Sequence, residues 1–446
     1  MQSSSLGLVT YALICVGLLA ASWRHPGAAI AGVLCMFGLE QWGQATTKFF
    51  AHHQSATNLL IGGILVFALI VQFFRTGLVL FKGYPTIGWL TLAFFLYAFA
   101  TIQWAPRPDL SLNLWESRWP YIVTIVMLCP LLITEERDLH AANAALALVG
   151  GTLAMLLLFF VKWESRRIVL DDVLGNPLAI AAMAGLVVVI LILTEPGPRS
   201  VLWFSLKWTF VAMALALIVR SGSRGQLLGV LLVCLVCWPI SRGLRNVKQF
   251  AILTLVILFI SAAVGWTMQE FWGGEVASGK GRWNEHAAQQ DVSGRLANAM
   301  LMVDLASESP TTFLFGLGNS AAYDRRILGI YPHFLPLEVL AEEGVFGFVL
   351  YGIILVLTLR SCYMGLQLSQ DDPDLRMLLG GLFGMYLFTV ILSLKQGSLL
   401  VNLEPFMLGI CLGRFEQVMA RRRFDAQSDL EVTRSSFRYL ADQPTS

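Results

Sequence analysis

Residues 176–194 read NPLAIAAMAGLVVVILILT, and this stretch decides the class of fold. It has no charged residue and is long enough to cross the roughly 30 Å hydrocarbon layer of a bilayer as an α-helix. Similar apolar blocks recur along the 446-residue chain, which is 56% hydrophobic and only 13% charged. About a quarter of the residues in an ordinary soluble protein are charged. The sequence therefore predicts an all-α protein that crosses the membrane many times.

We predict about 12 to 13 membrane spans from the length of the apolar blocks. The candidate spans are 6–23, 27–42, 58–74, 85–103, 120–134, 141–161, 176–194, 201–219, 225–240, 249–266, 337–359, 376–394 and 398–413. The chain then divides into N-terminal membrane helices (1–266), a large loop (267–336), C-terminal membrane helices (337–413) and a tail (414–446). The first span lacks a positively charged leader and a small-residue cleavage site, so we expect it to be retained.

The loop 267–336 is the one long connection in an otherwise tightly connected bundle, and such loops are usually functional. Within it, residues 291–310 predict an amphipathic helix that begins at Ser293 as N-cap and is stopped by Pro310. Its apolar residues at helical spacing are Leu296, Met300 and Val303. We expect this helix to cover the mouth of a site.

Orientation follows from the distribution of lysine and arginine. The short loops on the two sides carry nearly equal numbers of them, so the arginine-rich tail and the loop SRGLRNVK (241–248) decide. They place the tail in the cytoplasm and the loop 267–336 outside. Arginines on the outer side are therefore retained against the usual bias, which points to a use for them.

Two of these outer arginines lie in VRSGSRGQLLG (219–229), where Arg220 and Arg224 flank a turn that includes Ser223. Arginine near hydrocarbon is costly unless it is paired or reaches the interface. The N-terminus of the following helix adds positive potential, and the planar guanidinium matches phosphate oxygens. We therefore predict a phosphate site here. The alternative is that both arginines anchor the protein at the membrane interface.

Other outer arginines are further candidates. Arg295 again stands beside Ser and Gly, and its alternative role is a solvated helix residue or an ion pair with Asp291. Arg118, in WESRWPY (115–121), is a supporting candidate with an acid close enough in sequence to balance its charge.

The stretch YPHFLPLEVLAEEG (331–344) closes the large loop on the same side. His333 carries the side chain whose unperturbed pKa allows proton transfer near neutrality, so it is the candidate general base. Its alternative is a structural residue at the membrane edge. Acids at the head of a helix favour its positive N-terminus, and one of them could orient the His or Arg side chains. These acids are Glu338, Glu342 and Glu343.

The outer loops contain no cluster of Asp or His with the spacing of a divalent-metal site. They also lack a Gly-rich phosphate loop followed by Lys. Chemistry on a charged phosphate would therefore rely on arginines, and we expect no metal and no cofactor. We also expect no nucleic-acid partner.

These motifs together resemble the bacterial O-antigen ligase and polymerase superfamily, over roughly residues 160–415. The matching stretches are Asn176–Pro177, SGSRGQ (221–226), SGRLANAM (293–300), FGLGNS (315–320) and YPHFLPLEVLAEEG (331–344). The resemblance departs from the family at Phe334, where an Asn is common, and in the number of spans, which is commonly twelve.

The resemblance implies a multi-pass glycosyltransferase of the bacterial inner membrane with its active site facing the periplasm. Such an enzyme takes a glycan from undecaprenyl diphosphate and passes it to an acceptor hydroxyl. Arg224 and Arg295 match the family's diphosphate-contacting arginines and His333 its catalytic histidine, whereas Arg220 has no family counterpart.

The residue chemistry agrees with this implication. Displacing a diphosphate from an anomeric carbon develops negative charge, which preorganised arginines stabilise, while a general base activates the acceptor hydroxyl. Direct displacement would invert the anomeric configuration. The acceptor would be lipid A–core oligosaccharide for a ligase, or another lipid-linked repeat unit for a polymerase. A transporter of lipid-linked sugars and a structural or sensory membrane protein are the alternatives from other classes.

Overall fold

The computed structural model describes residues 3–81, 83–164, 167–170, 173–197, 200–243 and 285–441, with the single residues Lys248, Ala251, Leu255 and Phe259. Its helices are α1 (Ser3–Arg24), η1 (Pro26–Ala28), α2 (Ala29–Thr46), α3 (Lys48–His52), α4 (Ser55–Thr76), η2 (Gly77–Leu80), α5 (Thr86–Thr101), η3 (Ile102–Trp104), α6 (Pro108–Tyr121), η4 (Ile122–Leu128), η5 (Cys129–Leu132), α7 (Glu136–Phe159), α8 (Pro177–Leu193), α9 (Val201–Arg220), α10 (Arg224–Arg242), α13 (Glu285–Ala306), α14 (Pro310–Phe315), η6 (Ala321–Tyr323), α15 (Leu335–Glu342), α16 (Gly344–Leu368), α17 (Pro373–Ser393) and α18 (Glu404–Ala441). The predicted span 249–266 falls almost wholly outside the described residues.

Eight of the described helices are long and apolar enough to cross a membrane. They are Gly7–Arg24, Ser55–Thr76, Thr86–Trp104, Glu136–Phe159, Val201–Arg220, Arg224–Arg242, Gly344–Leu368 and Pro373–Ser393. The apolar helix α8 is shorter, at 17 residues. The prediction of a helical multi-pass membrane protein is therefore confirmed, but the number of twelve to thirteen spans is not.

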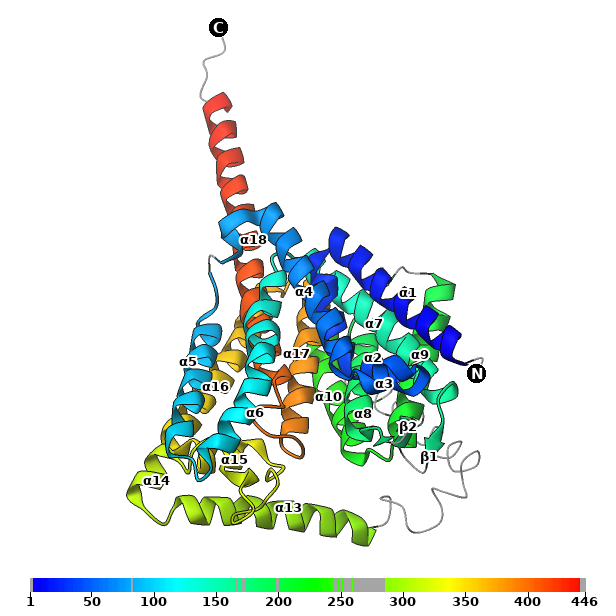
Figure 1. Ribbon diagram of the computed structural model, residues 1–446. Helices are drawn as coiled ribbons and strands as arrows, with labels where there is room; N and C mark the ends of the chain where they lie inside the picture. Colours follow the sequence, from blue (N-terminus) through cyan, green and yellow to red (C-terminus); the bar gives the residue numbers. More distant parts are fainter. Residues whose placement is uncertain are drawn as a thin grey trace.

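The bundle is built around α8, which is buried along almost its whole length. A helix that is apolar on every side is stable only when neighbours surround it. Here α8 packs against α9, α10 and α17, while α2 packs along α7 (Figure 1). A second apolar cluster joins α5, α16 and α18, where the Phe406 ring lies 5.7 Å from Phe94 and 5.1 Å from Phe95.

Two predicted spans are less regular than their sequence suggests. The span 120–134 continues α6 as a π-helical segment (η4) and then as the short 3₁₀ helix η5. Pro120 and Pro130 explain this, because proline lacks the N–H that an α-helix needs at interior positions. The predicted span 398–413 begins only at Glu404, since residues 398–403 form a turn, and the helix then runs unbroken to Ala441.

The predicted span 337–359 was also wrong at its start. The segment is two helices, α15 and α16, which meet at Gly344 with φ +68°. A Cβ at Gly344 would stand 2.4 Å from the Gly316 nitrogen, so only glycine allows this close approach. The separate helix α15 therefore lies beside the large loop, and the membrane helix begins after it.

At the lower end of the bundle, α13 lies across the ends of the membrane helices and packs on α15 (Figure 1). The predicted loop helix is thus present, but two details were wrong. Ser293 lies inside α13, which begins at Glu285, so it is not the N-cap. The buried face is formed by Ala299, Met302 and Ala306, with Val303 packed beside them as predicted, whereas Leu296 and Met300 are about half exposed.

The same end carries a small antiparallel sheet that the all-α prediction missed. It consists of β1 (Trp163–Glu164), β2 (Arg167–Leu170) and β3 (Val173–Leu174), in that order. The sheet fills the connection between α7 and α8. It places the Trp163 ring beside the end of α9.

Candidate functional site

The turn between α9 and α10 fixes the first two arginines. Ser221 Oγ donates to Ile218 O at 2.7 Å and lies 2.9 Å from Ser223 Oγ, so both hydroxyls stabilise the turn itself. Ser223 Oγ also lies 3.5 Å from Pro177 O, which brings the Asn-Pro start of α8 next to this turn. Arg220 therefore ends α9 and Arg224 begins α10.

Arg220 and Arg224 have different surroundings. Arg220 is only 8% exposed, and its guanidinium carbon lies 5.5 Å from the centre of the Trp163 ring. This cation–π contact satisfies part of its charge within the fold. Arg224 is half-buried at the first position of α10, where the helix N-terminus adds its own positive potential.

A lysine that the sequence analysis did not single out joins this end of α10. Lys395 Nζ donates to Gln226 Oε1 at 3.0 Å, and a Cβ at Gly225 would stand 2.1 Å from that Nζ. Gln226 Nε2 donates in turn to Gln396 Oε1 at 2.7 Å. The turn after α17 therefore packs directly on the residues that follow Arg224. The sequence does mark Lys395 in the same way as the outer arginines, because it is a basic residue that follows an apolar span with no acid beside it.

Arg295 reaches the same place from the large loop. It lies on α13 and its Nη1 donates to the Lys395 carbonyl oxygen at 2.7 Å. Arg224, Arg295 and Lys395 thus form one cation cluster, although they come from three segments far apart in the sequence. Arg118 is not part of it, because no hydrogen bond or ion pair among the described residues joins its half-buried side chain on α6 to the cluster.

His333 stands just before α15 with a positive φ of +63°. Such a conformation is uncommon for a residue other than glycine and marks a position whose orientation the surrounding fold imposes. The imidazole packs on the Tyr331 ring with centroids 4.1 Å apart. Burial raises the pKa of the Tyr331 hydroxyl and the Arg295 guanidinium acts in the opposite direction, so Tyr331 connects His333 to the cation cluster.

The acids that follow His333 bind the loop and the turn around it. Glu342 accepts from the backbone N–H groups of Ser320 and Ala322, at 2.7 and 2.9 Å. Glu338 Oε1 accepts from the Leu399 N–H at 2.9 Å, which ties α15 to the turn after α17. Among the described residues, no hydrogen bond joins either acid to His333.

Glu343 lies among the polar groups of the same loop. Its Oε1 accepts from Asn319 Nδ2 at 2.8 Å, and its Oε2 lies 2.8 Å from Thr101 Oγ1. Thr101 Oγ1 also lies 2.8 Å from Ala98 O, yet a hydroxyl has only one proton to donate. Burial raises the pKa of Glu343 to about 7, and a protonated Glu343 would satisfy both contacts by donating to Thr101.

Burial likewise raises the pKa values of Glu338 and Glu342, and the charge of Glu343 raises both further, as does the charge of Glu342 for Glu338. All three side chains are at most 2% exposed. The three acids are therefore buried groups that hold the loop and the turn after α17 in place.

An apolar groove opens beside Tyr331 and runs up between α2 and α8 on one side and α17 and α18 on the other. Its volume is about 140 Å³. The polar residues gather where α8 begins, where α17 ends and where α18 begins with Glu404, whereas aliphatic and aromatic side chains line the rest. The polar lining residues include Asn176, Tyr331, Gln396 and Asn402, and the apolar ones include Leu34, Met183, Leu186 and Phe388.

Residues 208–352 match the family model described as O-Antigen ligase. This segment carries the O-antigen ligase family domain. The match includes Arg220, Arg224, Arg295 and His333, and it excludes Lys395. Ligases and polymerases share this domain, and both are membrane glycosyltransferases that act on lipid-linked glycans.

No curated protein matches the chain. One solved chain that matches belongs to the structure titled "Structural coordination of polymerization and crosslinking by a peptidoglycan synthase complex". It is 16% identical, with a TM-score of 0.44, and the alignment covers 77% of this protein and 99% of that chain.

Proposed function

We propose that this protein transfers an O-antigen-like glycan from undecaprenyl diphosphate to a hydroxyl of lipid A–core oligosaccharide, on the periplasmic side of the bacterial inner membrane. In this proposal, the cation cluster holds the diphosphate and His333 removes the proton from the acceptor hydroxyl. The reaction inverts the anomeric configuration because the acceptor attacks opposite the leaving diphosphate.

The proposal rests on one observation: the polar end of an apolar groove lies next to the cation cluster. A polyprenyl diphosphate has a long apolar chain and a compact, doubly charged head. The groove beside Tyr331 is apolar along most of its length, and its polar end contains Gln396 and borders Lys395. Arg224 and Arg295 stand at that same end, so chain and head would each meet surroundings of matching polarity.

The cluster supplies what the leaving group needs. Arginine donates from a rigid planar fork that fits two phosphate oxygens at once, and lysine adds a point charge. Placed before the reaction begins, such groups stabilise developing charge without further reorganisation. Arg220 contributes positive potential next to the turn, and its guanidinium also contacts the Trp163 ring.

In this proposal, His333 acts on the acceptor. Its half-buried imidazole lies at the edge of the large loop, one residue beyond the Pro332 that separates it from Tyr331. A neutral imidazole there can accept the proton of a sugar hydroxyl that attacks the anomeric carbon.

The test is reconstitution of the full chain in nanodiscs with purified undecaprenyl-diphosphate-linked glycan and lipid A–core, followed by mass spectrometry of the product. We expect glycan attached to lipid A–core. Longer lipid-linked glycan without any attached product would instead favour the polymerase activity of the same family. Absence of both products with intact donor and acceptor would contradict glycan transfer.

The same assay tests the dependence on metal. Among the described residues, no group of three His, Cys, Asp or Glu side chains is arranged to hold a metal ion. Because the proposed mechanism relies on arginines, we expect transfer to persist in excess EDTA. Activity that EDTA abolishes and Mg²⁺ restores would contradict this mechanism.

A further inference from the structure

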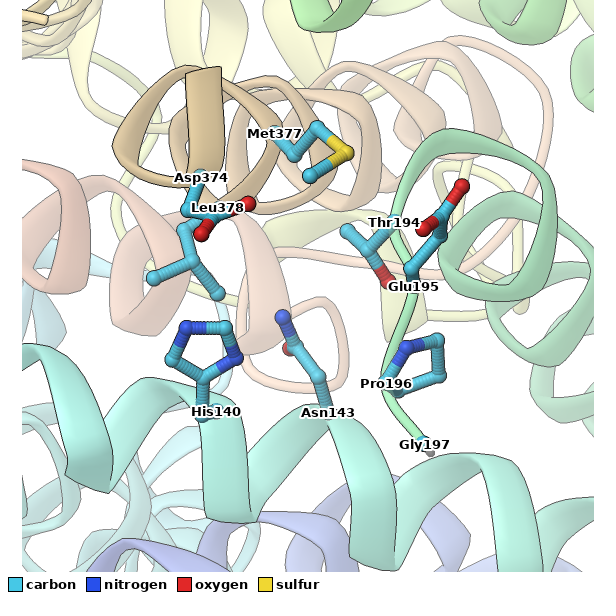
Figure 2. Close-up of a pocket in the computed structure, with 9 residues that line it drawn as sticks. All are labelled: His140, Asn143, Thr194, Glu195, Pro196, Gly197, Asp374, Met377 and Leu378. Carbon is cyan, nitrogen blue, oxygen red and sulfur yellow. The ribbon is translucent and has the colours of Figure 1, made fainter. Parts of the chain in front are cut away.

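A second polar cavity lies at the opposite end of the bundle from the cation cluster. It is lined by α7, by the connection that follows α8, and by the first turns of α17 (Figure 2). The 21-residue helix α17 separates it from Lys395, which corresponds to about 30 Å at 1.5 Å per residue. The cavity has a volume of about 200 Å³. Its lining residues are His140, Asn143, Thr194, Glu195, Pro196, Gly197, Asp374, Met377 and Leu378.

Asn143 is the residue of this cavity that requires explanation. It is only 1% exposed, and its Nδ2 is buried without a hydrogen-bond partner. Figure 2 shows the amide pointing from α7 into the space between α17 and the Thr194–Gly197 connection. Leaving a buried donor unsatisfied is unfavourable, so such groups generally have a partner in the working protein. The partner that fits is an oxygen of a molecule in the cavity.

The charges around the cavity indicate which charged group the bound molecule carries. Glu195 and Asp374 stand on two different walls, and among the described lining residues there is no lysine or arginine. Glu195 is paired with Arg242 at 2.8 Å, and Lys207 Nζ lies 3.4 Å from Thr194 O behind the wall. The carboxylate of Asp374 has no ion-pair partner among the described residues. Asp374 is exposed, so its carboxylate is available to a cation that enters the cavity.

From these groups we infer that the cavity binds a small protonated amino alcohol, whose ammonium group faces Asp374 and whose oxygen accepts from Asn143 Nδ2. A cation with N–H donors next to an oxygen acceptor satisfies both features at once. A volume of about 200 Å³ corresponds to roughly seven water molecules at ~30 Å³ each, which is enough for such a group. The inference does not depend on the proposed glycan transfer, because the two sites share no residue.

This chemistry has two sources, a free amino alcohol and the ethanolamine head of a phospholipid. The probes are therefore ethanolamine itself and a short-chain phosphatidylethanolamine. Choline and a phosphatidylcholine of the same chain length serve as controls, because their quaternary nitrogen has no N–H to donate. The full chain in detergent is titrated with each, and the apparent unfolding temperature and calorimetric binding are measured.

We expect saturable binding and a higher unfolding temperature with an ethanolamine probe, and neither effect with the choline probes. Binding by free ethanolamine identifies a soluble ligand, and binding only by the phospholipid identifies a lipid head group. Asp374→Asn and Asn143→Ala should each weaken binding at least tenfold. Asp371→Asn, an exposed acid nearby that does not line the cavity, should leave it unchanged.

Asn143→Ala also gives a readout without ligand. Because it removes a buried donor without a partner, the unliganded variant should be at least as stable as the wild type. The inference is overturned if neither ethanolamine probe binds, if choline binds equally well, or if binding survives Asp374→Asn. If neither ethanolamine probe binds, the cavity holds only water, whereas equal choline binding or surviving binding in Asp374→Asn would rule out the contact between the ammonium group and Asp374.

Discussion

At the scale of single residues, His333 is set apart by its backbone as well as by its imidazole. Its positive φ and its packing on Tyr331 fix the ring in one orientation at the edge of the groove. Lys395, in contrast, is not conspicuous in the sequence, and its importance comes from the residues that it contacts in the fold. Its carbonyl oxygen accepts a hydrogen bond from Arg295, and its ammonium group donates one to Gln226, which lies two residues after Arg224.

Replacing His333 with alanine or glutamine should abolish transfer while the protein still accumulates and binds donor. Loss of a general base typically reduces rates on the order of 10²–10⁴-fold, and an amide cannot replace it. The wild-type rate should also fall on acidification, because only the neutral imidazole accepts a proton. Transfer rates at several pH values in nanodiscs provide the measurement. The exposed His53 is the matched control, and His53→Ala should have normal activity. A normal rate in His333→Ala would rule out this role.

Replacing Arg224 or Arg295 with lysine keeps the charge but removes the planar fork. Hydrogen bonds to charged groups contribute about 1.5–3 kcal/mol, so each variant should lose transfer roughly 10- to 100-fold. Donor affinity, measured by titration with lipid-linked glycan, should weaken in parallel. Arg118→Lys is the control and should behave like the wild type, since Arg118 lies outside the cation cluster. Full activity in both cluster variants would reduce these arginines to membrane anchors.

At the scale of elements, the break between α15 and α16 organises the site. Gly318 N–H donates to Glu342 O and Leu317 N–H to Ala341 O, both at 2.9 Å, so the FGLGNS stretch packs backbone to backbone on the end of α15. The acids of α15 and Glu343 then bind the loop around it. The FGLGNS stretch and these acids therefore form a joint that holds the segment carrying His333 in place.

This joint should weaken as the pH rises. The folded-state pKa of Glu343 is raised to about 7 from an ordinary value near 4.5, so its contribution to stability is fully present below about pH 4.5. The contribution is lost as the pH rises through about 7, by an amount on the order of a few kcal/mol. The apparent unfolding temperature in detergent should therefore fall between pH 5 and pH 8. In Glu343→Gln, whose side chain stays neutral, the fall should be smaller, and an equal fall would refute the assignment.

At the scale of the whole molecule, the polar groups are divided between two ends of an apolar bundle. The cation cluster, the groove mouth and His333 lie at the end where α13 contacts α15 and Lys395, and the Asp374 cavity lies at the opposite end of α17. Such a division suits an enzyme whose substrate lies in one leaflet. It also makes the orientation of the protein testable with a pair of residues.

Thr311 and Asp371 are both exposed and lie at opposite ends of α16 and its neighbours. In intact spheroplasts, an impermeant thiol reagent should label Thr311→Cys and should not label Asp371→Cys. The seven native cysteines are buried or half-buried, so the unmodified protein is the background control. The reverse labelling pattern would place the candidate site in the cytoplasm and exclude the proposed function.

The sequence by itself determined the membrane class and the identity of the candidate residues, because both depend on local chemistry. Apolar length alone indicates a membrane helix, and Arg224, Arg295 and His333 stand out as polar groups at span ends. The number of spans did not follow from the sequence, because hydropathy does not distinguish a regular helix from the π-helical and 3₁₀ continuation of α6. Hydropathy also does not reveal where a proline or a glycine interrupts an apolar run and splits it into two helices.

Only the tertiary structure decided which residues meet. Lys395 joins Arg224 and Arg295 because α10 packs along α17 and α13 crosses their ends, contacts between segments far apart in the chain. The same is true of the acids of α15, whose partners are backbone groups that no sequence pattern marks. Hydrogen bonds and burial depend on three-dimensional neighbours, whereas hydropathy depends only on each residue and those beside it in the chain.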